Sequence, residues 1–155
     1  MDTERELQIE PHHGAARAAR RFVEETLSEW GLANRLREVL LVSHELVANA
    51  LVHARSAVRL RLRRLPDRLL VEVGDRDPRL PRRTPIDNFT SVSGRGIMIV
   101  EQLAREWGAR PVADGKIVWA EFVCEDRAMG AVTGLAEGAE SGPVGGVNGL
   151  AAAAG

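Results

Sequence analysis

The sequence predicts an α+β fold, a two-layer sandwich in which three helices cover one face of a mainly antiparallel, mixed sheet. Short segments of alternating apolar and polar residues indicate strands, and longer segments with a period near 3.6 residues indicate helices. Their order along the chain is β-α-α-β-β-loop-α-β-β. Strands joined by tight turns pair antiparallel, and helices gathered on one face of such a sheet are typical of α+β proteins.

The first half of the chain supplies one strand and two helices. Residues 6–10 alternate and stop at a proline, which indicates a short strand. Residues 14–30 place their apolar side chains on one face, so a helix is predicted there, and Gly31 ends it. Asn34 is predicted to be the N-cap of a second helix that runs to about residue 54.

The second half supplies a hairpin, a long loop and a helix. Residues 56–65 alternate apolar side chains with arginines, which predicts a strand with one solvated face, and residues 68–75 form its return strand. Residues 77–94 contain three prolines and show no period, so a long loop is expected. Residues 94–107 open with glycines and continue as an amphipathic helix. The final elements are strands at about 107–113 and 116–124.

Composition separates a folded domain from a tail. Residues 128–155 contain 8 Gly and 8 Ala but no Lys or Arg, so they have few large apolar side chains to bury. We therefore expect a domain over residues 1–127 and a flexible tail over 128–155. The net charge of −1, the single cysteine, and the lack of a long apolar run or signal-peptide pattern predict a soluble, cytoplasmic protein. Direct binding to nucleic acid or membrane is not expected.

Polar residues recur at four-residue intervals in the second helix. The stretch SHELVANALVHA places Glu45, Asn49 and His53 on one narrow arc of an otherwise apolar helix. One interpretation is a satisfied core cluster in which Glu45 bonds Asn49 or a neighbouring arginine. The other is the wall of a site, with an amide oxygen for a hard cation and a carboxylate that acts as a base.

Two further features follow in the chain. Asp75 ends an apolar strand, where it is either an ordinary turn residue or an acceptor for an exocyclic amine such as adenine N6. After the long loop, Gly94, Arg95 and Gly96 lead into a helix, and backbone N–H groups at such a start are suited to phosphate.

These features, in this order, resemble the gyrase, heat-shock-chaperone and histidine-kinase ATPase superfamily, which has the Bergerat ATP-binding fold. Within it the chain is most similar to small anti-sigma-factor serine/threonine kinases and their actinobacterial relatives, over roughly residues 7–124. The resemblance implies ATP and Mg²⁺ as cofactors. The resemblance also implies that Asn49 would bind Mg²⁺ and that Glu45 would be the catalytic base. Asp75 would accept a hydrogen bond from adenine. Gly94 and Gly96 would lie in the phosphate loop, and residues 79–93 would form the ATP lid.

Two candidates keep alternative interpretations, and two positions depart from the family pattern. His53 either contacts the phosphates indirectly, through a neighbouring group, or is a packed histidine at the helix end. Arg95 either reaches a phosphate or faces solvent. Asp77 stands where the superfamily often has glycine. Ile117 stands where relatives often have a threonine whose hydroxyl supports the adenine contact.

Two functions compete. The first is a serine/threonine kinase that phosphorylates an anti-sigma-factor antagonist and also holds a sigma factor. The second is a nucleotide-dependent protein-binding switch with little or no phosphoryl transfer. The retained Glu45 favours the kinase, because nucleotide binding alone needs no base. A homodimer is compatible with the sequence. A histidine-kinase catalytic domain and a DNA-binding regulator fit less well, because neither an upstream phosphoacceptor helix nor a basic helix-turn-helix is found.

Overall fold

The computed structural model describes residues 2–54, 56–77, 79 and 92–125, and of residues 53, 54 and 92–96 only the backbone. The described residues up to Cys124 belong to one compact unit. The predicted tail, residues 128–155, lies outside the described residues. The elements are β1 (Thr3–Ile9), α1 (Ala15–Glu29), the 3₁₀ helix η1 (Ala33–Arg35), α2 (Leu36–Ala54), β2 (Val58–Arg64), β3 (Arg68–Asp75), α3 (Val92–Leu103), β4 (Glu106–Val112) and β5 (Gly115–Val123).

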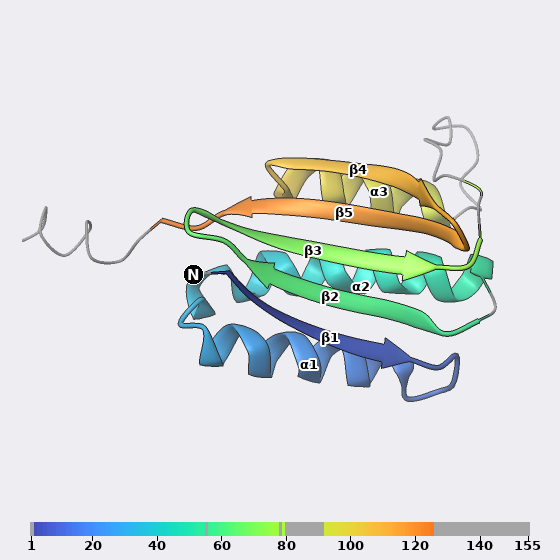
Figure 1. Ribbon diagram of the computed structural model, residues 1–155, viewed down its shortest axis with the longest axis horizontal. Coiled ribbons are helices and arrows are strands. Elements are labelled where there is room, and N and C mark those ends of the chain that lie inside the picture. The colour runs from blue at the N-terminus through green and yellow to red at the C-terminus, as the bar shows by residue number, and fades with distance from the viewer. Residues whose placement is uncertain (1, 55, 78, 80–91, 126–155) are drawn as a thin grey trace, which may run out of the picture. The chain divides into compact units, whose positions relative to one another are not determined.

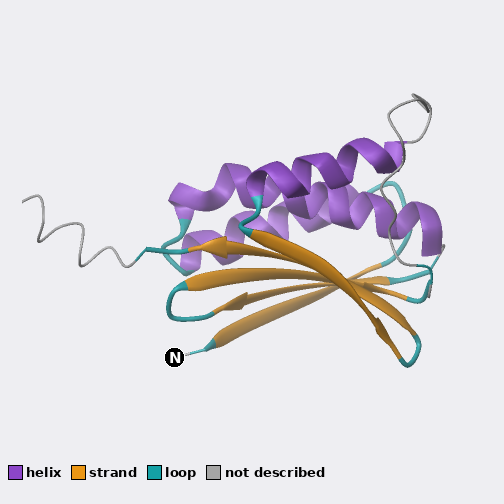
Figure 2. Ribbon diagram, turned by 90° about the horizontal axis from the view of Figure 1, so that it is seen from above, coloured by secondary structure: helices purple, strands orange, loops and turns teal. Residues whose placement is uncertain are grey.

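The strands form one five-stranded sheet in the order β1-β2-β3-β5-β4. All four neighbouring pairs are antiparallel. The three α-helices lie together on one face of this sheet (Figures 1 and 2). The predicted α+β two-layer fold is therefore confirmed.

The core lies between the sheet and the helix layer. Along β2, Val58, Leu60 and Leu62 are fully buried, while the arginines between them project to the other face. The helices present matching apolar stripes, among them Val23 of α1 and Val42 of α2, both of which are fully buried. The period of two in a strand and of 3.6 in a helix thus brings the two apolar surfaces together.

The structure differs from the sequence-based expectations at two helix starts. Asn34 lies inside η1 instead of capping α2. Helix α3 begins at Val92, so Gly94 and Gly96 belong to its first turns and not to a loop before it. Both differences lie within the few residues by which helix ends are commonly misplaced.

Helix α2 is also less enclosed than its apolar sequence suggests. Leu41 is 45% exposed and Val52 is 71% exposed, because the helices form the outer layer of the sandwich and one side of α2 faces away from the sheet. None of the helices in the described part of the chain has the length and apolar character needed to cross a membrane.

The sheet face opposite the helices carries a lattice of ion pairs. Arg61 donates to Glu6 across the β1–β2 pair at 2.9 Å. Glu72, in the middle of the sheet, accepts from Arg110 of β4 at 3.0 Å and lies 4.0 Å from Arg61. The arginines at 59, 61 and 63 all have glutamate partners, as expected of a solvated strand face.

Candidate functional site

Four chain segments meet at one end of the molecule. The C-terminal end of α2, the end of β3, the start of α3 and the β4–β5 turn all lie at the right-hand side of Figure 1. Helix α2 packs against both β3 and α3. The predicted site residues are therefore gathered from distant parts of the sequence at this end, with Asn49 on α2, Asp75 at the end of β3, and Gly94 to Gly96 in α3.

Glu45 and Asn49 lie one turn apart on α2, between buried apolar neighbours. Both side chains are half-buried, whereas Leu46 and Ala50 next to them are 3% and 5% exposed. Among the described residues, neither side chain makes a hydrogen bond or an ion pair. The core-cluster interpretation requires such a bond, so within this part of the chain the arrangement favours a site wall. Of His53 the structure describes only the backbone, as the last full turn of α2.

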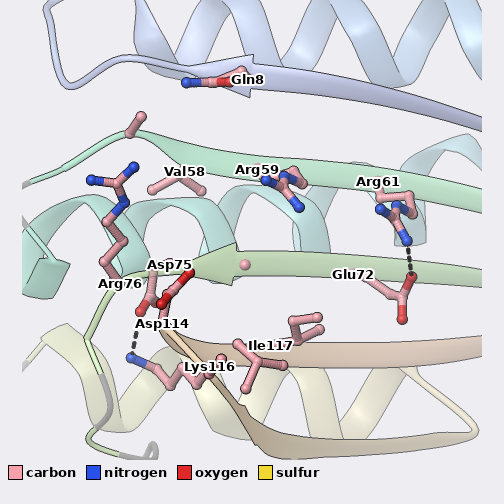
Figure 3. Close-up of a pocket in the computed structure, with 14 residues that line it drawn as sticks. Gln8, Val58, Arg59, Arg61, Glu72, Asp75, Arg76, Asp114, Lys116 and Ile117 are labelled. Carbon is pink, nitrogen blue, oxygen red and sulfur yellow. Dashed lines mark hydrogen bonds and ion pairs between the residues drawn. The ribbon is translucent and has the colours of Figure 1, made fainter.

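Asp75 is held in place by hydrogen bonds at the end of β3. Its side chain is 1% exposed. One oxygen, Oδ1, accepts from the Lys116 ammonium at 3.0 Å and from the backbone N–H of Asp77 at 2.8 Å (Figure 3). The same ammonium donates to the Asp77 carbonyl oxygen at 3.0 Å. Asp75 is therefore more than a turn residue at the surface, because its carboxylate is buried, ion-paired and fixed.

Lys116 was missed by the sequence reasoning, and the strand register explains why it matters. Lys116 stands directly opposite Asp75 in the β3–β5 pair, whereas Ile117 stands opposite Gly74. Residues directly opposite in an antiparallel pair project to the same face, and the next residue projects to the other. The expectation that position 117 faces the adenine contact is therefore wrong, and Lys116 holds that place. Its one available signal is that it is the only lysine beside twenty arginines.

The β4–β5 turn is pressed against the end of β3. At Gly115, where φ is 155°, a Cβ atom would lie 1.9 Å from the carbonyl oxygen of Asp75 and 2.7 Å from the Cα of Arg76. No other residue fits there without moving the backbone. This close approach brings Lys116, the next residue, within reach of the Asp75 carboxylate.

Asp77 takes part through its backbone and its side chain. Its carboxylate accepts a forked pair of hydrogen bonds from Arg79, at 2.8 Å and 3.0 Å. These bonds, together with the one from the Arg79 backbone N–H, hold the pKa of the Asp77 carboxyl well below its usual range. At this position, where the superfamily often has glycine, the charged side chain of Asp77 thus pairs with Arg79. The backbone of Asp77 hydrogen-bonds with the Asp75 carboxylate and with the Lys116 ammonium.

A hollow of about 350 Å³ lies beside the end of β3 and the β4–β5 turn, and Asp75 and Lys116 are among the residues that line it. Its floor is Gly74, with Arg59 and Ile117 on the neighbouring strands, and Arg76 and Asp114 also line it (Figure 3). No described residue of α2 or α3 lines this hollow, so Glu45, Asn49 and the start of α3 do not belong to it.

Residues 9–122 match the histidine kinase-like ATPase domain family. The chain belongs to this family. A search of curated proteins finds no match. Membership implies that the protein binds ATP, and it confirms the Bergerat-type superfamily that the sequence motifs indicate.

The chemistry of the described residues fits the adenine end and the phosphate end of an ATP site in a histidine kinase-like ATPase domain. Asp75 offers a fixed, buried acceptor for an amine. The start of α3 offers backbone N–H groups without partners inside the helix, and Gly94 lies in that first turn. The side chain of Arg95 and most of the predicted lid, residues 80–91, lie outside what the structure describes.

The donor set also fits Mg²⁺ held mainly by phosphates. Among the described residues there is no group of three His, Cys, Asp or Glu side chains that could hold a metal alone. Mg²⁺ in nucleotide sites is commonly bound by one or two protein oxygens, with phosphate oxygens and water completing its coordination. The amide oxygen of Asn49, which is free of described partners, could supply one such ligand.

Proposed function

We propose that this protein is an anti-sigma factor serine/threonine kinase that phosphorylates an anti-sigma factor antagonist. The observation that carries the proposal is the pair Glu45 and Asn49, half-buried one turn apart on α2 and without a described partner, in a domain of an ATP-binding family. A carboxylate that lies between buried apolar residues without a partner among the described residues costs stability, so a role in chemistry gives a reason for its presence.

Each proposed residue has a distinct task. Asn49 offers its amide oxygen to Mg²⁺, and Asp75 accepts the hydrogen bond of the adenine amine. Glu45 takes the proton from the serine or threonine hydroxyl of the antagonist. Bound ATP supplies the phosphoryl group, and Mg²⁺ neutralises the charge on its phosphates. Phosphoryl transfer depends mostly on positioning and on charge neutralisation. Glu45 therefore contributes one proton transfer, while the other residues hold the reacting groups in position.

The remaining candidates lie around the phosphates. Gly94 and Gly96 would let the backbone of the α3 start approach the phosphate chain, with Arg95 and His53 as further contacts. The protein partners in this proposal are a sigma factor and its antagonist, and they rest on the resemblance to the small anti-sigma-factor kinases. A homodimer would be compatible with both.

Two substitutions on α2 test the kinase. Asn49→Ala removes the proposed Mg²⁺ ligand, so both Mg²⁺-dependent ATP binding and phosphoryl transfer should fall. Glu45→Ala removes the proposed base, so ATP should still bind while transfer to the antagonist falls by roughly 10²- to 10⁴-fold. Transfer is followed with labelled ATP, and binding by isothermal titration. The matched control is Glu38→Ala, because this carboxylate lies on the same helix but is already paired with Arg35 at 3.2 Å.

The outcomes separate the two functions. Circular dichroism first establishes that each variant is folded, since both residues have buried neighbours. If Glu45→Ala transfers phosphate at the wild-type rate, Glu45 is a structural carboxylate. If the wild type transfers no phosphate to any antagonist while ATP still changes its affinity for a partner, the protein is a nucleotide-dependent switch.

A further inference from the structure

We propose that Lys116 is a positioning residue that makes the ATP site selective for the amine of adenine. Its ammonium donates to the buried Asp75 carboxylate and holds it in one orientation, so that the carboxylate presents an acceptor to the amine. The inference rests on the proposed placement of adenine at Asp75.

The geometry assigns the two carboxylate oxygens different tasks. Both hydrogen bonds that Asp75 receives from described residues, from Lys116 and from the Asp77 backbone, end on Oδ1. No hydrogen bond from a described residue ends on the second oxygen, Oδ2, and we assign this oxygen to the ligand. A carboxylate tied at one oxygen by two donors has little freedom to turn, so the direction in which Oδ2 accepts is set before any nucleotide arrives.

The buried carboxylate of Asp75 requires a counter-charge, and the Lys116 ammonium supplies it. The side chains of Asp75 and Lys116 are 1% and 7% exposed. A buried carboxylate without a counter-charge either takes up a proton or turns toward water. Without the ammonium, the Asp75 side chain would lose the donor that fixes its orientation and would no longer be aimed at the amine. The preference for an amine would then be lost.

The surrounding backbone supports the same pair from two sides. The Asp77 carbonyl oxygen accepts a second hydrogen bond from the Lys116 ammonium at 3.0 Å. The close approach at Gly115 fixes the strand from which Lys116 projects. Lysine suits this place because its ammonium is a compact charge at the end of an apolar stem, whereas the larger guanidinium of arginine requires a wider space.

The test compares two nucleotides that differ only in the amine. Binding of ATP and of purine riboside triphosphate, which lacks the 6-amino group, is measured by isothermal titration with Mg²⁺. One hydrogen bond to a charged acceptor predicts that the wild type prefers ATP by about 10- to 100-fold. In Lys116→Met this ratio should fall to about 3-fold or less, while binding of the triphosphate lacking the amine changes little, because the phosphate contacts are untouched.

Three further variants make the result specific. Asp75→Asn should lose the ratio as Lys116→Met does. Arg110→Met, which removes an ion pair on the opposite sheet face, should keep it. Lys116→Gln retains a hydrogen-bond donor without the charge, so it should also lose the ratio, and it carries the test if Lys116→Met does not fold. Melting temperatures without nucleotide are recorded for every variant.

The results distinguish this inference from the proposed site. If the wild type prefers ATP and both folded Lys116 variants keep that preference, the inference is overturned and Lys116 serves stability alone. If both nucleotides weaken equally in the Lys116 variants, the same conclusion follows. If the wild type itself shows no preference for ATP, adenine does not lie at Asp75, and the inference falls together with that placement.

Discussion

The ion pair between Glu72 and Arg110 should stabilise the fold more than a surface pair of similar length. The Glu72 side chain is 6% exposed and that of Arg110 is 52% exposed, with 3.0 Å between the charged atoms. At this distance two unit charges attract by about 5 kcal/mol for an effective dielectric constant of 20. Because half of the Arg110 side chain is in water, screening and desolvation reduce the expected coupling energy to about 1–2 kcal/mol.

A double-mutant cycle measures this coupling directly. Glu72→Gln, Arg110→Gln and the double variant are unfolded in urea, and the coupling energy is the departure of their free energies of unfolding from additivity. The matched control is the pair Arg21–Glu25 on α1, whose charged atoms are 2.8 Å apart and whose side chains are 79% and 55% exposed. Its expected coupling energy is smaller than that of Glu72 and Arg110, because water surrounds and screens both of its side chains. Equal coupling in the two pairs would show that distance, and not the burial of Glu72, decides their strength.

Two further predictions concern the end of the chain. Cys124 is 8% exposed, and burial raises the pKa of its thiol, so less reactive thiolate is present at pH 8 than in an exposed cysteine. Labelling with a disulfide reagent at that pH should be at least about tenfold slower in the folded protein than in urea, and equal rates would contradict the burial. Deleting residues 128–155 should change the melting temperature by less than about 2 °C and leave ATP affinity unchanged, since this segment has little apolar surface to pack. A large loss of stability would place the domain boundary beyond residue 127.

The parts of the fold that were predictable from the sequence are those fixed by local patterns. β3 is predicted at 68–75 and found at Arg68–Asp75, because a short apolar run between a Pro-Asp turn and a charged loop determines both of its ends. The grouping of Glu45 and Asn49 follows equally from helix periodicity. In each case the residues that decide the structure are close together in the sequence.

The ion pair of Lys116 with Asp75 was not predictable in this way, since its partners are 41 residues apart. Their contact depends on which strands are neighbours and on a register that a single-residue shift would reverse, turning Ile117 toward Asp75 and Lys116 away from it. The absence of a Cβ at Gly115 permits this register, because a Cβ there would lie 1.9 Å from the carbonyl oxygen of Asp75, and this constraint acts only once β5 lies beside β3.

The two departures from the family pattern can be understood as one local arrangement. At Asp77, where relatives often have glycine, the backbone N–H donates to Asp75 and the carbonyl oxygen accepts from Lys116. Its side chain is drawn to Arg79, so the larger residue does not disturb these backbone bonds. Lys116 then supplies a charged donor on the face where a hydroxyl was expected. An ammonium neutralises the buried carboxylate, which a hydroxyl cannot do, so at this site the acceptor for adenine is held by charge and backbone together.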